Sequence, residues 1–111
     1  MVPVKFTTGT SAPVWTQAGS WTSFYGVVAT NAESAAYFIK LYWQKDSPTA
    51  PSVGVTVPDL TIPIYTTTLG VEFHRALVQN GPLWYTVTKN AGDTDATALS
   101  SGGDIITLLV E

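Results

Sequence analysis

The chain contains no cysteine and carries little charge. Its 111 residues include one His, five Lys and Arg, and eight Asp and Glu. Without Cys, a disulfide framework, a thiolate nucleophile and a thiolate metal ligand are all excluded. The charged share of 12% is half of the globular average of about 25%. With a net charge of −3 and scattered basic residues, the chain lacks the Lys and Arg clusters that bind a nucleic-acid backbone.

Long apolar runs are missing as well. No run of about 18 apolar residues is present, so a membrane-spanning helix is not expected. The first fifteen residues, MVPVKFTTGTSAPVW, lack the apolar block of about 7 to 15 residues that a signal peptide needs. We therefore expect the protein to be made and kept in the cytoplasm, or to leave it without a cleaved signal.

What the chain does contain is short alternation of apolar and polar residues between turn clusters. With 45% hydrophobic residues, a chain of this length can bury one core. The pattern predicts an all-β, antiparallel β-sandwich over residues 21–111. Residues 1–20 are expected to form an N-terminal arm, which could include one short strand around Val14 to Thr16. Strands are expected within the segments 24–31, 35–44, 59–65, 70–74, 81–90 and 104–111.

The alternation assigns side chains to the two faces of each strand. The last segment, DIITLLVE, is apolar on both faces, which predicts a central strand or one covered by a partner. In the other strands the expected inward side chains are Tyr37, Ile39, Leu41 and Trp43, then Leu60, Ile62 and Ile64, then Val71 and Phe73, and then Leu83, Tyr85 and Val87.

The stretch from residue 30 to residue 44 allows two interpretations. Thr30 and Glu33 have the spacing of a helix capping box, and apolar residues recur after them at helical intervals. The centre, YFIKLYW, is instead a run of aromatic and β-branched residues that suits a pleated sheet. The strand is favoured, with a hairpin turn over residues 31–34.

Pro63 lies in the middle of the segment DLTIPIY. Proline has no N–H to give to a sheet ladder, so it is confined to edge strands and bulges. We therefore expect residues 59–65 to form an edge strand, in which the proline discourages pairing with another sheet.

Catalytic arrangements are missing from the sequence. His74 is the single imidazole, and no G-x-S-x-G elbow surrounds a serine. His74 is interpreted as a solvent-facing strand residue rather than a catalytic base. Asp93 and Asp95 are close in sequence, but Asp in a turn-rich loop usually caps its own backbone. We expect no enzymatic activity and no cofactor.

A calcium site is the remaining chemical hypothesis. Asp93, Asp95 and Asp104 could supply the oxygen ligands that Ca²⁺ prefers, although their spacing is not that of an EF-hand. The stretch SSGGD lacks the Lys and Thr of a phosphate-binding loop. No metal site is predicted, and the calcium hypothesis stays open.

Aromatic side chains are expected on the outward faces. Phe38, Tyr42, Tyr65 and Trp84 fall at outward positions, and several exposed aromatics together indicate a binding surface. A slip of one residue in strand register would exchange the faces and place them in the core. For Trp84 the two interpretations are equal, whereas Tyr65 beside Pro63 favours an interface.

Three segments, NAESAAYFIKLYWQ, TAPSVGVTVPDLTIPI and GPLWYTVTKNAGDTDATAL, precede a final apolar strand. In this order they resemble a family of small bacteriophage virion proteins, and the resemblance covers residues 24–110. It implies a jelly-roll-like sandwich that decorates or cements a capsid, or that builds fibre and tail parts. The four tryptophans are not part of the shared pattern, so a surface specific to this protein could use them.

The resemblance and the composition together predict a non-enzymatic virion protein, assembled in the host cytoplasm. Its expected partners are the major capsid protein or other virion proteins, with a homotrimer favoured for its own assembly. Neither nucleic acid nor a membrane is an expected partner. The residues expected at the interface are Trp15, Phe38, Tyr42, Pro63, Tyr65 and Trp84.

The alternative is a carbohydrate-binding module of a fibre or tail. A sugar platform needs two or three aromatic residues on one exposed face. Trp43 and Trp84 are expected on opposite faces, and Trp15 and Trp21 in the region of the arm. That placement weakens the glycan hypothesis without removing it.

Overall fold

Eight strands make up the secondary structure of the described chain. The computed structural model describes residues 2–20, 23–45, 49–66, 70–78 and 81–111, and these include no helix. Accordingly, the described residues contain no helix that could cross a membrane. The strands are β1 (Val2–Thr7), β2 (Thr16–Gly19), β3 (Ser23–Ala29), β4 (Tyr37–Trp43), β5 (Leu60–Ile64), β6 (Gly70–Val78), β7 (Leu83–Thr88) and β8 (Ile105–Val110).

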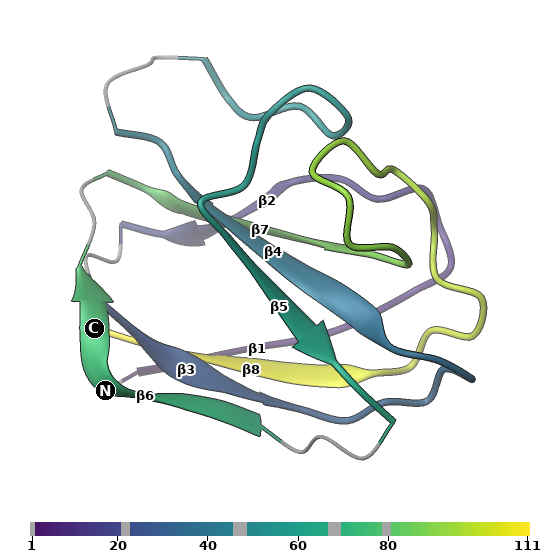
Figure 1. Cartoon of the computed structure of the whole chain (residues 1–111). Coiled ribbons are helices and arrows are strands. Elements are labelled where there is room, and N and C mark those ends of the chain that lie inside the picture. Colours follow the sequence, from purple (N-terminus) through teal and green to yellow (C-terminus); the bar gives the residue numbers. More distant parts are fainter. Residues whose placement is uncertain (1, 21–22, 46–48, 67–69, 79–80) are drawn as a thin grey trace.

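The strands form two four-stranded antiparallel sheets that lie one over the other (Figure 1). One sheet has the order β1-β8-β3-β6, and the other has the order β2-β7-β4-β5. The predicted antiparallel β-sandwich is confirmed. The helical interpretation of residues 30–44 is wrong, because Tyr37–Trp43 form β4 in the middle of a sheet. Packing of aromatic and branched side chains between two sheets outweighs the local capping signal.

The N-terminal residues are built into both sheets. β1 pairs with β8 along its whole length, from Val2 opposite Val110 to Thr7 opposite Ile105. β2 pairs with β7 and begins at Thr16, where the short strand of the arm was expected to end. An arm over residues 1–20 is therefore not confirmed, because the ladder partners of these strands come from the far end of the chain.

The core lies between the sheets and follows the predicted alternation. The four inward side chains of β4 are buried, and Trp43 meets Phe24 of β3 edge to face at 6.3 Å between ring centroids. Ile62, Ile64 and Leu83 are buried, and Leu60, Val71, Tyr85 and Val87 pack against this core. The side chain of Phe73 lies outside the described residues.

β8 is a central strand, as predicted. It lies between β1 and β3, and Ile106, Leu108 and Val110 are fully buried. The opposite face of β8 carries Ile105, which is 42% exposed. One face of β8 is thus buried in the core, while its other face remains partly exposed.

β5 is an edge strand, as Pro63 predicted, and pairs with β4 alone. The Gln44 amide donates to the Pro82 carbonyl at 2.9 Å, one step beyond the β4–β7 ladder. Because ladder bonds alternate between the two sides of a strand, the even-numbered residues of β4 bond β7 and the odd-numbered ones bond β5. Residue 63, opposite Phe38, therefore turns its main chain away from β4. The missing N–H of Pro63 lies on the free edge, where it removes no ladder bond.

Candidate functional site

The residues expected at an interface lie on the outward face of the β2-β7-β4-β5 sheet or directly beside its strands. Phe38 lies opposite Pro63, and Tyr42 lies opposite Trp84, in the two ladders of β4. Cross-strand partners point to the same side of a sheet. Trp15, just before β2, packs edge-on against Tyr42 with ring centroids 6.1 Å apart. Tyr65 follows β5 two residues after Pro63 and is 55% exposed.

We call these six residues the aromatic face. The strand register is the predicted one, because Trp43 and Leu83 are buried inward while Trp84 points outward. Apart from Tyr65, its members are half-buried. The Trp84 indole N–H donates to the Gln44 side-chain oxygen at 3.0 Å, which fixes the ring orientation. The surface is thus made largely of partly exposed aromatic side chains.

The centre of the same outward side is covered by the protein's own loops. Lys40 is 1% exposed and Thr86 is 2% exposed, although both belong to outward positions. The loop after β7 folds back over them, and the Lys40 ammonium donates to the Gly92 carbonyl at 2.6 Å (Figure 1). Outward positions are therefore not always exposed: Lys40, Thr86 and Thr88 are buried, and the loop that follows β7 accepts hydrogen bonds from the side chains of Lys40 and Thr88.

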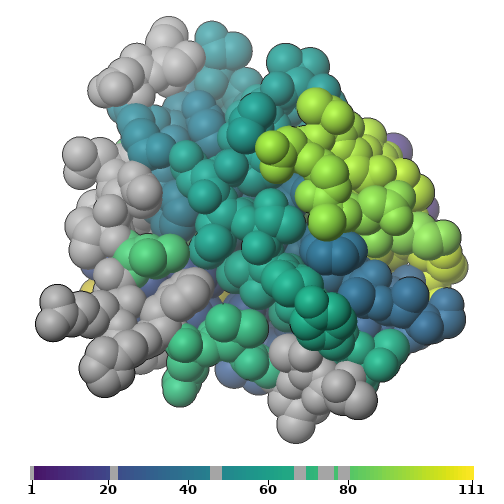
Figure 2. Space-filling view, viewed as in Figure 1, coloured from purple at the N-terminus to yellow at the C-terminus, as the bar shows by residue number. Residues whose placement is uncertain are grey.

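Two loops meet on this side of the molecule. Figure 2 shows the segment before β5 in teal beside the segment after β7 in lime green. A Cβ on Gly54 of the first loop would lie 3.7 Å from the Thr94 carbonyl oxygen of the second. The two loops therefore divide the aromatic face into a part around Trp15, Tyr42 and Trp84 and a part around Phe38, Pro63 and Tyr65.

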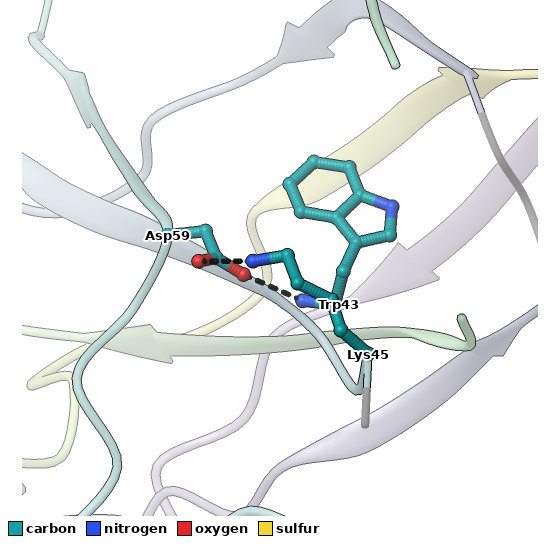
Figure 3. Close-up of polar contacts among 3 residues, drawn as sticks. All are labelled: Trp43, Lys45 and Asp59. Carbon is teal, nitrogen blue, oxygen red and sulfur yellow. Dashed lines mark hydrogen bonds and ion pairs between the residues drawn. The ribbon is translucent and has the colours of Figure 1, made fainter. Parts of the chain in front are cut away.

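Asp59 anchors the first loop at the start of β5 (Figure 3). Its carboxylate accepts the Trp43 amide N–H at 2.8 Å and pairs with the Lys45 ammonium at 2.8 Å. One carboxylate thereby joins the end of β4 to the residue that leads into β5. The sequence pattern alone held no signal for these partners.

The buried Lys40 sets the electrostatics beneath the second loop. Burial lowers the pKa of Lys40, and the negative charges of Asp95 and Asp93 oppose this shift. Slight burial raises the pKa of Asp95, but hydrogen bonds from Thr97 and Asn90 outweigh it, so that its pKa lies below the ordinary value. The charges of the two loop carboxylates therefore act on the buried ammonium of Lys40.

The structure does not bring together the three carboxylates of the calcium hypothesis. Asp104 is fully buried, and it accepts hydrogen bonds from the Thr8 hydroxyl at 2.7 Å and the Ala32 amide at 2.6 Å. Asp95 is bound within its own loop by Asn90 and Thr97. Within the described part of the chain, no cluster of three metal-ligating side chains is found. The side chain of His74, the expected solvent-facing residue, lies outside the described residues.

Comparison with known proteins found no similar protein: family models, curated proteins and solved structures all gave no match.

Proposed function

We propose that this protein is a non-enzymatic structural protein of a bacteriophage virion, and that it binds the head shell through the aromatic face. The observation that carries the proposal is that aromatic residues predicted to face outward lie on the outward side of one sheet, in two parts on either side of the two loops. The resemblance of residues 24–110 to small virion proteins supplies the location. The low charge of the chain agrees with a surface that meets protein, since the cores of interfaces are poor in charge and rich in Tyr and Trp.

We further propose that the sandwich is a jelly roll. The strand pairs β1–β8, β2–β7, β3–β6 and β4–β5 are those of a long hairpin rolled up over two sheets. Jelly rolls of eight strands occur in viral capsid proteins and lectins. The strand order supports this assignment without any reference to the sequence resemblance.

Half-buried rings suit a surface of this kind. The Trp84 ring is held by its hydrogen bond to Gln44, so its binding loses little side-chain entropy. Covering the remaining apolar surface contributes about 25 cal/mol per Å². A protein that binds only the assembled shell stabilises that shell by mass action. Capsid decoration therefore needs no catalytic group.

The test combines solution mass with shell binding. Light scattering over a concentration series measures self-association, and co-sedimentation with head shells of the phage that encodes the chain measures binding. We expect a fixed closed oligomer, saturable binding, or both. Trp84→Ala and Tyr65→Ser should weaken shell binding at least tenfold, on the order of 1.4 kcal/mol each. Val55→Ser is the matched control, because Val55 is 77% exposed in a loop and is not part of the aromatic face.

A monomer at every concentration, together with no binding to shells, would overturn the proposal. Equal losses in the control and in the two aromatic variants would also contradict the aromatic face as the contact surface.

Carbohydrate binding is the second candidate function, and one observation favours it. Trp15, Tyr42 and Trp84 lie on one side of the sheet, where Tyr42 is a neighbour of both tryptophans, and a sugar platform needs two or three such aromatic residues on one face. Titrating neutral polysaccharides against tryptophan fluorescence tests it. A saturable change that disappears in Trp84→Ala, with no binding to shells, would replace the first function by the second.

A further inference from the structure

A cavity opens at the edge of the sandwich where β2 separates from β7. Its volume is about 230 Å³, and its walls come from the β1–β2 connection, from β7 and from Leu99. Phe6 of β1 and Tyr85 of β7 stack face to face beside it, with ring centroids 4.0 Å apart. Each described residue that lines the cavity is uncharged. The cavity is therefore suited to an uncharged group.

The edge of β7 has an unpaired step at this cavity. Since the even-numbered residues of β7 bond β4, its odd-numbered residues turn their main-chain groups the other way. On that side Tyr85 pairs with Thr16, and the Lys89 amide donates to the Thr97 carbonyl at 3.0 Å. Continued pairing would place Val14 opposite Val87, but β2 begins only at Thr16 and both residues line the cavity. Among the described residues, none pairs with the main chain of Val87 on this side.

The neighbouring residue Thr86 also has a polar group without a partner, on the other face of β7. The hydroxyl of Thr86, which lines the cavity, is buried and has no hydrogen-bond partner among the described residues. An unsatisfied buried group costs about 1–3 kcal/mol. Buried polar groups are nearly always hydrogen-bonded in proteins. The Thr86 hydroxyl is enclosed, whereas the main chain of Val87 lies at the cavity and marks the place where a ligand can supply a missing partner.

The spacing of these groups decides the class of ligand. The N–H and C=O of Val87 belong to one residue, and the complement of such a pair is the C=O and N–H of one residue in an antiparallel strand. The open stretch lies between the pairings at Tyr85 and at Lys89, which leaves room for about three extended residues, at 3.4 Å for each. A side chain opposite Val87 would point inward, the side on which Val87 packs against the core.

We propose that this slot binds an extended peptide segment of another polypeptide, which adds a short strand to β7 and inserts an uncharged apolar side chain opposite Val87. This is strand addition at a sheet edge, in which main-chain bonds supply affinity and a pocket supplies specificity. The slot lies beside the aromatic face and does not depend on the function proposed for it.

The probe is the capped tripeptide acetyl-Thr-Val-Thr-N-methylamide, titrated into the ¹⁵N-labelled full chain. We expect a saturable shift of the Val87 amide resonance at millimolar peptide. Hydrogen exchange at Val87 should be fast in the free protein, and about tenfold slower when the peptide is at ten times its Kd. Ala12→Phe, which fills the slot from its exposed wall, should abolish the effect, whereas Ala91→Phe outside the slot should not.

The chemical control is the same peptide with its central amide N-methylated. It keeps the side chain but cannot donate to the Val87 carbonyl, so it should not bind. Three results would each overturn the proposal. The first is equal binding of the N-methylated peptide, and the second is no shift of the Val87 amide resonance up to a 20-fold molar excess, at about 10 mM peptide. The third is slow hydrogen exchange of the Val87 amide in the free protein. A shift caused by glucose, with none from the peptide, would also overturn it and assign the slot to a sugar.

Discussion

Lys40→Met is the change that best tests how the second loop is held on the sheet. The ammonium donates to the Gly92 carbonyl at 2.6 Å from a side chain that is 1% exposed. A hydrogen bond to a charged group contributes about 1.5–3 kcal/mol. Gly92 also accepts the Asp95 amide at 3.0 Å, so the turn within the loop persists when the lysine is lost. Methionine keeps most of the apolar stem of the side chain but not the hydrogen bond.

The expected net effect is smaller than the hydrogen bond alone. Burial lowers the pKa of Lys40, which means that the charged form is held at a cost that methionine does not bear. We expect a loss of about 1–2 kcal/mol in the free energy of unfolding, or roughly 4–8 °C in Tm for each kcal/mol. Urea denaturation measures the loss. Hydrogen exchange should also accelerate at the amides of Lys89 and Asp95, which bond within this loop.

The pH dependence gives a second readout with a definite sign. Because the folded pKa of Lys40 lies below its unfolded value of about 10.4, the unfolded chain binds more protons between the two values. Stability due to this group therefore rises with pH in that window, and the rise is absent in Lys40→Met. Lys89→Met is the control, since Lys89 is exposed beside the same loop. Unchanged or increased stability in Lys40→Met, with unchanged loop exchange, would refute the reasoning.

Three further changes test the fold around the site. Gly81→Ala should destabilise the protein by more than about 2 kcal/mol in thermal unfolding, because φ of Gly81 is +92° and a Cβ would overlap the Gln44 carbonyl oxygen. Gly92→Ala is the control and should be nearly neutral, because a Cβ there meets nothing closer than 3.9 Å. Equal effects of the two changes would contradict this prediction. Thr86→Val should raise the free energy of unfolding by about 1 kcal/mol, because it removes a buried hydroxyl without a partner; a loss of stability in urea would show that the hydroxyl is satisfied. Burial, followed by the charges of Asp104 and Glu33, raises the pKa of Tyr37, so stability due to Tyr37 falls as pH rises above about 10. Tyr37→Phe should lose about 1 kcal/mol at neutral pH with the bond to the Thr30 carbonyl, and should lack that alkaline fall in unfolding curves measured from pH 8 to 11.

Local pattern was enough to place the strands and their faces. The period of two in YFIKLYW put Tyr37, Ile39, Leu41 and Trp43 on the buried side, because successive side chains of a strand point to opposite faces. Pro63 placed β5 at an edge, because a missing N–H is tolerated there. The expected interface residues of the strands lie on one side of the sheet because they occupy the alternate positions of each strand. This alternation does not indicate which residues they contact.

Only the tertiary structure decided which residues lie next to each side chain. Lys40 stood at an outward position by alternation, and its burial depends on Gly92, which lies 52 residues along the chain. The first residues read as an arm, and they became a strand because β8 supplies their ladder; Thr8 and Asp104, 96 residues apart, close that end of the sandwich. The slot at Val87 likewise exists because β2 begins at Thr16 and leaves the next step of β7 unpaired. The sequence by itself determined which face of each strand is apolar, because that face depends on the period of the residues along the chain. The segments that cover the other face are decided by contacts between distant residues, and only folding brings those residues together.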